Sequence, residues 1–370
     1  MKIVKSLVTF CFLQICVVMA LEADPAQAWQ LGPFVRPDGV NPIIKPDTNL
    51  IFDCPMNNSP VHWAALNTFN PAAVVKDGRV CVLYRSEDAS GTMMVGGHTS
   101  RIGLAESDDG LRFVSRPAPV LFPGEDSEKA NEWTGGCEDP RVVEAEDGTY
   151  VMMYTEYRRG NTGRLARLAV ATSPDLIHWT KHGPAFEKLG GDFAGHYCKS
   201  GAILTRLING RLIAVKYHGK YWMYWGEGEI RLASSDNLMD WEPGPVVLRT
   251  RPGKFDSALV EAGPPAIMTE QGMLLIYNGK NDSKDGDTSL PAGTYSGGQA
   301  LFDLNNPTKL LKRTDIPFYK PEAAFERTGQ YVAGTTFLEG LVAFHGQWLL
   351  YYGCADSYVG MAIAKQRDKE

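Results

Sequence analysis

The sequence lacks the features that mark several common protein classes. Its 370 residues contain 7 cysteines without a Cys-x-x-Cys pair, and Cys11 and Cys16 lie in the apolar N-terminal segment. The remaining cysteines are odd in number, so neither a disulfide framework nor a zinc site is indicated, and no metal or cofactor is predicted. Acidic residues outnumber basic ones, 43 to 37. The formal net charge of -6 argues against a nucleic-acid partner, because phosphates require a basic face.

Long segments with the apolar spacing of an amphipathic helix are scarce. The chain instead has 38 glycines, 23 prolines and many short stretches of apolar and aromatic residues. Glycine and proline are typical of turns, so this composition favours a turn-rich, all-β protein.

The N-terminus has the pattern of a secretory signal peptide. A short basic region at 1–5 precedes an apolar run at 6–20, and small residues that suit cleavage follow between 20 and 28. The run is short for a membrane span, so no integral membrane segment is predicted. Cys16 follows Ile15 rather than a small residue, which gives lipid anchoring little support. We therefore expect a leader at 1–28 and an exported domain, periplasmic or extracellular, at 29–370.

One strand pattern recurs along the chain. A turn glycine is followed by apolar and aromatic residues, as in Gly78-Arg-Val-Cys-Val-Leu-Tyr-Arg85. A spacing of about 60 to 70 residues fits a four-stranded blade with one long loop. We predict a single five-bladed β-propeller, in which residues of several blades converge on a central site; a β-sandwich with accidental self-similarity is the alternative. The five stretches lie at 78–85, 148–155, 210–217, 272–278 and 346–353.

The stretch Glu138-Asp139-Pro140-Arg141 is the first candidate for chemistry. It sets two carboxylates and a guanidinium on a turn that proline stiffens and the preceding Gly135-Gly136 permits. Loops on a β-scaffold often display catalytic carboxylates. The alternative is that Asp139-Pro140 only caps a turn, because Asp-Pro commonly starts one.

Further motifs follow in order along the chain. From about residue 60 to the C-terminus, their succession resembles glycoside hydrolase family 130, the mannoside phosphorylases and related β-mannosidases. The resemblance implies a five-bladed propeller whose partner is a mannose-containing oligosaccharide. The motifs are Asn70-Pro71-Ala72, Leu83-Tyr84-Arg85, Ser100-Arg101-Ile102, Cys137-Glu138-Asp139-Pro140-Arg141, Lys199-Ser200-Gly201, Glu261-Ala262-Gly263-Pro264-Pro265 and Tyr351-Tyr352-Gly353-Cys354-Ala355-Asp356.

The resemblance also implies roles for single residues. Asp139 corresponds to the proton donor, and its proton is thought to reach the glycosidic oxygen through a mannose hydroxyl. The chemistry is reasonable, since departure of a sugar needs an acid and sugar hydroxyls are recognised by Asp, Asn and Arg side chains. The positions that match those around the mannose in the −1 subsite are Asn70, Arg85, Arg101 and Asp356.

These assignments have structural alternatives. Arg85 ends a predicted strand and could be a solvated or bridging charge, while Asn70 could cap a turn before proline. Arg141 and Lys199 complete the cationic part of the predicted substrate-binding set. Lys199 could form part of a phosphate site, or it could instead orient a sugar hydroxyl or pair with Glu227 or Glu261.

An aromatic run offers a platform for a second sugar. Pyranose faces pack on aromatic rings, so Tyr224 is assigned to substrate binding in the +1 subsite. The alternative is core packing between blades. The run consists of Tyr221, Trp222, Tyr224 and Trp225.

Two departures from the family pattern bear on the nucleophile. Phosphorylases of the family commonly end the third repeat strand with His-Arg-Pro, where this chain has Lys216-Tyr217-His218. They also tend to carry a lysine and a glycine where this chain has Leu259 and Glu261. A lost cation and a gained carboxylate both disfavour phosphate. An inverting hydrolase instead needs a base roughly 6.5 to 9.5 Å from the acid, and Glu227 and Glu261 are the candidates.

We therefore predict an exported inverting β-mannosidase that hydrolyses β-1,2-linked mannosides, a linkage that only the resemblance implies. One alternative is a β-mannoside phosphorylase that releases mannose 1-phosphate. A carbohydrate-binding propeller without catalytic activity is another. The cations that could form a phosphate site are Arg158, Arg159, Arg164, Arg167 and Lys199.

Overall fold

The structure is a computed structural model that describes residues 28–94, 96–160 and 163–367. The leader predicted at 1–28 lies outside the described residues except for its last position. The described part consists of β-strands and loops, and its helices are single turns such as α1 (Lys129–Glu132) and the 3-10 turn η3 (Ala324–Glu326). None of its helices has the length and apolar character needed to cross a bilayer. The predicted all-β class is confirmed.

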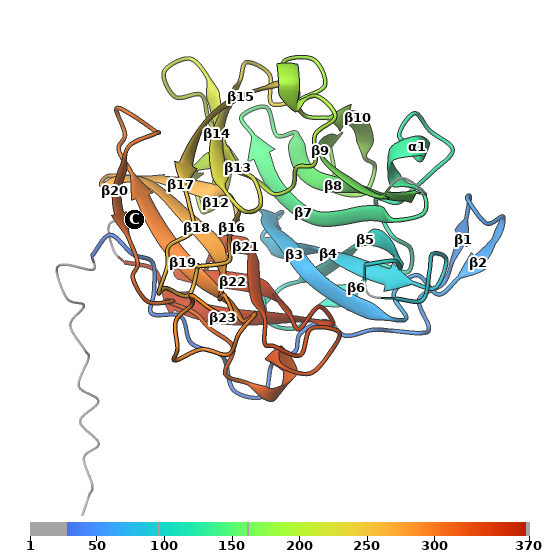
Figure 1. Cartoon of the computed structure of the whole chain (residues 1–370). Helices are drawn as coiled ribbons and strands as arrows, with labels where there is room; N and C mark the ends of the chain where they lie inside the picture. Colours follow the sequence, from blue (N-terminus) through green and yellow to red (C-terminus); the bar gives the residue numbers. More distant parts are fainter. Residues whose placement is uncertain (1–27, 95, 161–162, 368–370) are drawn as a thin grey trace, which may run out of the picture.

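The strands form successive antiparallel groups around a common centre (Figure 1). The repeat stretches of the sequence coincide with β4, β8, β12, β18 and β22, each following the innermost strand of its group. The groups are β3 (Asn67–Lys76), β4 (Arg79–Asp88), β5 (Thr99–Ser107) and β6 (Val114–Ser115); β7 (Gly136–Ala145), β8 (Tyr150–Gly160), β9 (Gly163–Ser173) and β10 (Thr180–Pro184); β11 (Gly201–Ile208), β12 (Arg211–Ala214), β13 (Tyr221–Trp225), β14 (Ile230–Ser235) and β15 (Trp241–Leu248); β16 (Leu259–Ala262), β17 (Ala266–Thr269), β18 (Gly272–Lys280), β19 (Tyr295–Phe302) and β20 (Leu310–Arg313); and β21 (Thr336–Phe344), β22 (Gln347–Cys354) and β23 (Tyr358–Lys365). A hairpin of β1 (Phe52–Cys54) and β2 (Ser59–Val61) precedes them.

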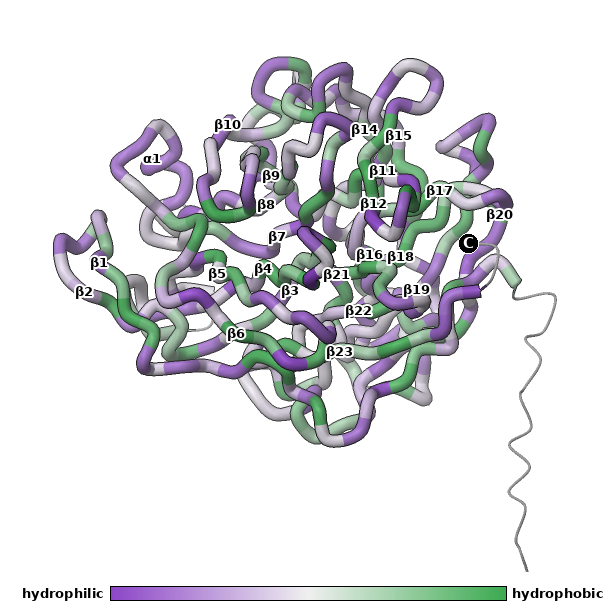
Figure 2. Tube along the Cα trace, turned by 180° about the vertical axis from the view of Figure 1, so that it is seen from behind, coloured by the Kyte–Doolittle hydropathy of each residue, from purple (hydrophilic) through white to green (hydrophobic). Residues whose placement is uncertain are grey.

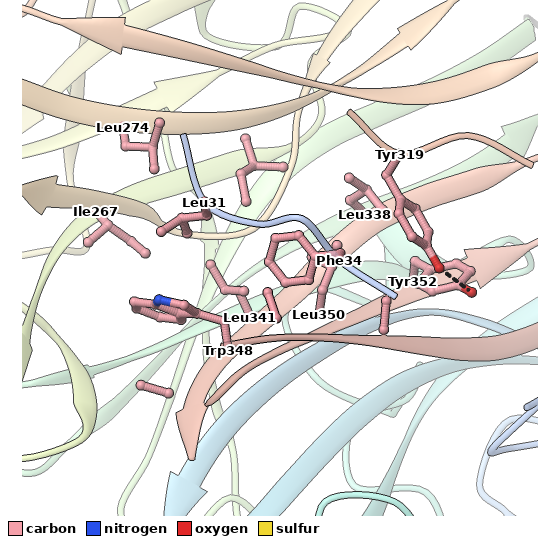
Figure 3. Packing of buried hydrophobic residues seen from close by; sticks show 14 of the residues in the cluster. Leu31, Phe34, Ile267, Leu274, Tyr319, Leu338, Leu341, Trp348, Leu350 and Tyr352 are labelled. Atoms are coloured by element: carbon pink, nitrogen blue, oxygen red, sulfur yellow. Dashed lines mark hydrogen bonds between the residues drawn. The ribbon is translucent and has the colours of Figure 1, made fainter. Parts of the chain in front are cut away.

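Apolar side chains fill the spaces between neighbouring groups. Figure 2 shows apolar residues along the strands and hydrophilic residues at many connecting loops. One cluster joins the last group to the first, where Tyr351 and Met361 pack with Val82 and Tyr84. Another joins the last two groups, and Figure 3 shows it with Trp348, Leu341 and Ile267 around Leu31 and Phe34 of the N-terminal segment. Burial on both faces explains why the repeat strands are almost continuous runs of apolar residues.

The N-terminal segment pairs with the outermost strand of the last group through isolated backbone bridges. Val35 and Ile363 exchange two backbone hydrogen bonds, of 2.9 and 2.8 Å, and Val359 donates to the Ile44 carbonyl oxygen at 3.1 Å. Arg36 fixes the segment further through a partly buried salt bridge of 2.7 Å to Glu326. Backbone hydrogen bonds therefore join the two ends of the described chain.

The innermost strands share a backbone irregularity that faces the centre. Pairing shifts register at Asn70 in β3 and at Asp139-Pro140 in β7. Both Asn70 and Asp139 have left-handed backbone, with φ of 46° and 49°. A bulge of this kind redirects one side chain out of the strand's alternation. The turn chemistry expected of Asp139-Pro140 is therefore used within a strand, to aim the carboxylate.

Gly136, just before this bulge, provides a test of the tight inner packing. Its φ is +108°, and a Cβ there would lie 2.1 Å from the Ser100 carbonyl oxygen of β5. We expect Gly136→Ala to lower the free energy of unfolding by about 2 to 5 kcal/mol, from left-handed strain plus overpacking. The matched change is Gly148→Ala, where φ is +85° but no atom lies within 4 Å. It should cost about 1 to 2 kcal/mol. Equal losses in urea unfolding would contradict the close contact between β5 and β7.

Candidate active site

A cavity of about 250 Å³ opens where the innermost strands meet. Its walls come from every strand group, so residues far apart in the sequence meet here as predicted. The lining residues are Phe69, Asn70, Arg85, Glu87, Gly96, Glu138, Asp139, Tyr157, Tyr197, Lys199, Glu227, Glu261, Tyr295, Gln330, Tyr331, Thr335, Phe337 and Asp356.

Asp139 projects from its bulge into a cluster of hydrogen-bond donors. Its Oδ1 accepts from Asn70 Nδ2 at 2.8 Å and from the Arg85 guanidinium at 3.1 Å, and Lys199 Nζ lies 3.5 Å from Oδ2. Burial favours the neutral acid, but Arg85, Lys199 and Arg141 outweigh it and hold the pKa of Asp139 well below its usual range. This group is therefore a carboxylate at neutral pH.

Glu138 shares both cations with its neighbour. Its Oε1 lies 2.9 Å from Arg85 Nη2, and its Oε2 lies 3.2 Å from Lys199 Nζ. Burial raises the pKa of Glu138, and the adjacent charge of Asp139 adds to that effect against the two cations. Protons therefore bind more readily to Glu138 than to Asp139.

Arg85 is the hub of this end of the cavity. Besides Glu138 and Asp139, it forms a salt bridge of 2.8 Å to Glu87. Glu87 in turn lies 3.0 Å from His98 Nδ1. The prediction that Arg85 belongs to the site is consistent with its place in the cavity wall, and the alternative of a bridging charge also describes what it does.

Glu227 and Glu261 face one another across neighbouring groups. Their backbones form an antiparallel bridge, and the Ser200 hydroxyl donates to Glu261 Oε1. Burial, reinforced by the charge of Glu227, raises the pKa of Glu261 to about 8 against Arg141 and Lys199. Glu227 is exposed to solvent. At neutral pH the buried member of the pair holds a proton.

Asp356 closes the site from the last group. Residues Ala355 and Asp356 both have left-handed backbone, with φ of 48° and 51°. Burial, together with the charges of Glu87 and Asp139, raises the pKa of Asp356 to about 6 against the opposing charge of Arg85. The carboxyl thus titrates close to neutrality.

Negative charge dominates the cavity wall. Its carboxylates are Glu87, Glu138, Asp139, Glu227, Glu261 and Asp356, against the two cations Arg85 and Lys199. Acids and amides in this number suit the hydroxyls of a sugar, which both donate and accept. In the part of the chain that the structure covers, no group of three or more His, Cys, Asp or Glu side chains is arranged to hold a metal ion.

The structure brings seven of the ten predicted site residues to the cavity. The seven are Asn70, Arg85, Asp139, Lys199, Glu227, Glu261 and Asp356.

The arginines suggested for a phosphate site do not line the cavity or have side chains outside the described part of the chain. Arg158 donates to the Ala130 carbonyl at 3.3 Å, and Arg167 pairs with Glu187 at 3.2 Å. The side chains of Arg159 and Arg164 lie outside the described part of the chain.

Two predicted arginines do not line the cavity. Arg101 is fully buried and pairs with Asp88 at 2.7 Å, with its guanidinium 5.0 Å from the ring of Phe52. Arg141 is 1% exposed and its Nη2 lies 2.9 Å from Glu339. Both were predicted to contact substrate, and both instead have buried protein partners.

Tyr224 also lies away from the cavity. It is fully buried, its ring stacks on Phe302 at 4.7 Å, and its hydroxyl donates to the Pro307 carbonyl at 3.1 Å. Core packing, the alternative stated for the aromatic run, describes Tyr224. The rings that line the cavity come from single positions in other segments and include Tyr157, Tyr197 and Tyr331.

Sequence reasoning missed several lining residues. Glu87 follows Arg85 by two positions and so lies on the same face of β4, a period that was available from the sequence. Gln330 and Thr335 lie in the loop before β21, which carries no recognisable motif. A larger hollow of about 820 Å³ lies elsewhere, and its walls are mainly apolar around Trp29 and Trp348.

Comparisons with known proteins point to one family. The model of the glycoside hydrolase 130 family, described as β-1,4-mannooligosaccharide phosphorylase, matches residues 35–368. A 1,2-β-oligomannan phosphorylase from Thermoanaerobacter sp. (strain X514) is 30% identical over 306 residues, covering 83% of this chain and 92% of that protein.

Solved structures are more similar still. One is 48% identical with a TM-score of 0.88, covering 92% of this chain and 98% of that one. Its description states that the GH130 family of mannoside phosphorylases contains glycoside hydrolases that target β-1,2 mannosidic linkages in Candida mannan. A glycosyl hydrolase from Bacteroides ovatus is 49% identical with a TM-score of 0.88, covering 92% of this chain and 96% of that one.

The proton held by Glu261 should make stability depend on pH. In the unfolded chain this carboxyl titrates near 4.5, and in the folded chain near 8. Between these values the folded state binds the extra proton, so this group's contribution to the free energy of unfolding falls as pH rises. Glu261→Gln imitates the protonated form. Relative to wild type, it should therefore gain more than about 1 kcal/mol of stability between pH 5 and pH 8.

The control for this pH series is Glu229→Gln, a carboxylate of the β13–β14 loop, which also carries Glu227; Glu229 pairs with Arg231 and Arg249 and does not line the cavity. Its stability difference from wild type should change little over the same range. A flat difference for Glu261→Gln as well would contradict the raised pKa.

Proposed function

Since this chain belongs to glycoside hydrolase family 130, whose enzymes act on mannosides, we propose that it is an inverting β-mannosidase that hydrolyses β-1,2-linked mannosides. The observation that carries the choice of water over phosphate is the composition of the cavity wall, which has two cations against six carboxyl groups, of which Glu261 holds a proton at neutral pH. Each unit of anionic charge placed 4 Å from a carboxylate costs about 4 kcal/mol at an effective dielectric of 20. Both cations already pair with carboxylates.

Asp139 is the acid in this proposal. Arg85 and Lys199 keep it ionised, so it has to take up a proton before it can act as an acid. Glu138, which holds a proton more readily and shares Arg85 and Lys199 with it, lies beside it as a source. Asp139 then donates, through a mannose hydroxyl, to the glycosidic oxygen as the bond to the anomeric carbon breaks.

Glu227 is the better of the two base candidates. A base has to be ionised and has to reach water. Glu227 is exposed at the cavity, whereas Glu261 is buried, carries a proton near neutrality and accepts from Ser200. We assign Glu227 to remove a proton from the attacking water, and Glu261 to lie beside it as a neutral, proton-bearing acid.

The alternative activity is phosphorolysis. The curated relative at 30% identity is a phosphorylase, and Arg85 and Lys199 do line the cavity. Against it stands the loss of the strand-end arginine, where this chain has Tyr217 and His218. Tyr217 lines the separate apolar hollow rather than the carboxylate-rich cavity.

Two broader proposals accompany the activity. The antiparallel groups, with apolar clusters between each neighbouring pair, support a five-bladed propeller. The N-terminal sequence supports export of the enzyme with removal of a leader at 1–28.

The choice of nucleophile is open to direct test. Incubation with β-1,2-mannobiose should release mannose at the same rate with and without inorganic phosphate. Asp139→Asn should lower kcat about 10²- to 10⁴-fold, because the acid is lost. Appearance of mannose 1-phosphate only when phosphate is present would overturn the hydrolase proposal.

The base can be identified by chemical rescue. Glu227→Ala should lower kcat about 10²- to 10⁴-fold, and azide should restore part of it by acting as the nucleophile in place of activated water. Glu261→Ala should lose activity without rescue, and Glu229→Ala should stay close to wild type. Rescue of the Glu261 variant alone would exchange the two roles.

A further inference from the structure

The loop between η3 and β21 forms one wall of the cavity and is firmly held. Tyr331 donates its backbone N–H to the Ala355 carbonyl at 3.0 Å, and the Gln330 N–H donates to Ser357 Oγ at 3.0 Å. Gly329 permits this close approach, since a Cβ there would lie 2.5 Å from the Ala355 oxygen. The loop is thus fixed to the turn that carries Asp356.

The side-chain amide of Gln330 is hydrogen-bonded through its nitrogen, while its oxygen has no partner among the described residues. Its Nε2 donates to Glu87 Oε2 and to the Asp356 carbonyl oxygen, both at 2.9 Å. These two bonds fix the orientation of the amide. Its Oε1 is buried and, among the described residues, has no hydrogen-bond partner. Gln330, a residue of the cavity wall, therefore has a hydrogen-bond acceptor, Oε1, that is held in a fixed orientation.

Thr335 presents a second polar group without a partner. Its side chain is 1% exposed, yet it lines the cavity. Its Oγ1 has no hydrogen-bond partner within the described part of the chain, although its backbone N–H donates to the Glu326 carbonyl at 2.8 Å. The backbone is satisfied and the hydroxyl is not.

Leaving such groups unpaired is costly. A buried donor or acceptor without a partner costs about 1 to 3 kcal/mol, and native structures seldom leave one unexplained. Two occur here on one loop, in the wall of a cavity lined by acids. A ligand rich in hydroxyls would satisfy both groups. A sugar hydroxyl can donate a hydrogen bond to the amide oxygen, and it can donate to or accept from the threonine hydroxyl.

We propose that Gln330 and Thr335 bind hydroxyls of the mannose ring that lies against Asp139, and that they are specificity-determining residues of this enzyme. Gln330 contacts Glu87 and the Asp356 backbone, and Glu87 pairs with Arg85, which holds Asp139. This chain of contacts places the loop at the acid side of the cavity. The assignment rests on the proposed mannosidase function.

The test pairs enzyme variants with substrates that lack single hydroxyls. Thr335→Val keeps the shape and removes the hydroxyl, and should lower kcat/KM on β-1,2-mannobiose about tenfold; Thr335→Ser should stay within about threefold. Gln330→Met should also lose about tenfold or more. The substrates are monodeoxy analogues of the non-reducing mannose, each lacking one hydroxyl. For each of the two residues, the analogue that lacks the hydroxyl bound by that residue should give the same kcat/KM with the variant as with the wild type.

The control is Thr328→Val, in the same loop, whose hydroxyl donates to the Ala324 carbonyl at 2.8 Å and does not line the cavity. It should leave kcat/KM unchanged, and thermal unfolding should confirm that all variants are folded. Losses that are the same for every deoxy analogue would show a merely structural role and overturn the proposal. A wild-type enzyme that cleaves no mannoside would instead overturn the proposed function, a separate outcome.

Discussion

The buried guanidinium of Arg141 is the interaction on which the site depends most. It donates to the carbonyl oxygens of Asp139 at 3.0 Å and Ala262 at 2.9 Å, and pairs with Glu339. It thereby joins the bulge that carries the acid, the strand that carries Glu261 and the innermost strand of the last group. A buried charge removed from such a set costs about 3 to 5 kcal/mol. Arg141 thus ties the backbone beside Asp139 to the backbone beside Glu261 and is not among the residues that line the cavity.

The cavity uses its carboxylates in two ways. Around Arg85 and Lys199 they are balanced by cations, which keep Asp139 charged. Toward Glu227 and Glu261 no cation lies within ion-pair distance among the described residues, and burial raises the pKa of Glu261 to about 8. Carboxyl groups of one cavity thus differ in their protonation because the number of nearby cations differs from one side of the cavity to the other, as the proposed division of roles requires.

The sequence was sufficient for the parts of the structure that repeat. Period and turn glycines located the strand following the innermost one in each group, and acidic motifs at strand ends located Asp139, Glu261 and Asp356. It failed where only side-chain direction decides. Arg141 follows Asp139 by two positions, but the bulge sends one into the cavity and the other into the core. Tyr224 lies in a strand with aromatic residues on both faces, so the sequence pattern does not show which face is turned to the core. The loop with Gln330 is placed by contacts to residues far away in the sequence, such as Glu87.

The pairing of residues near 35–44 with β23 has a consequence for how the chain assembles. These hydrogen bonds join positions more than 300 residues apart, as in the contact between Val35 and Ile363. Contacts of such separation form late, since they require the intervening chain to be ordered first. A chain synthesised from its N-terminus must therefore keep residues 35–44 unpaired until β23 emerges, and this pairing is completed only at that moment.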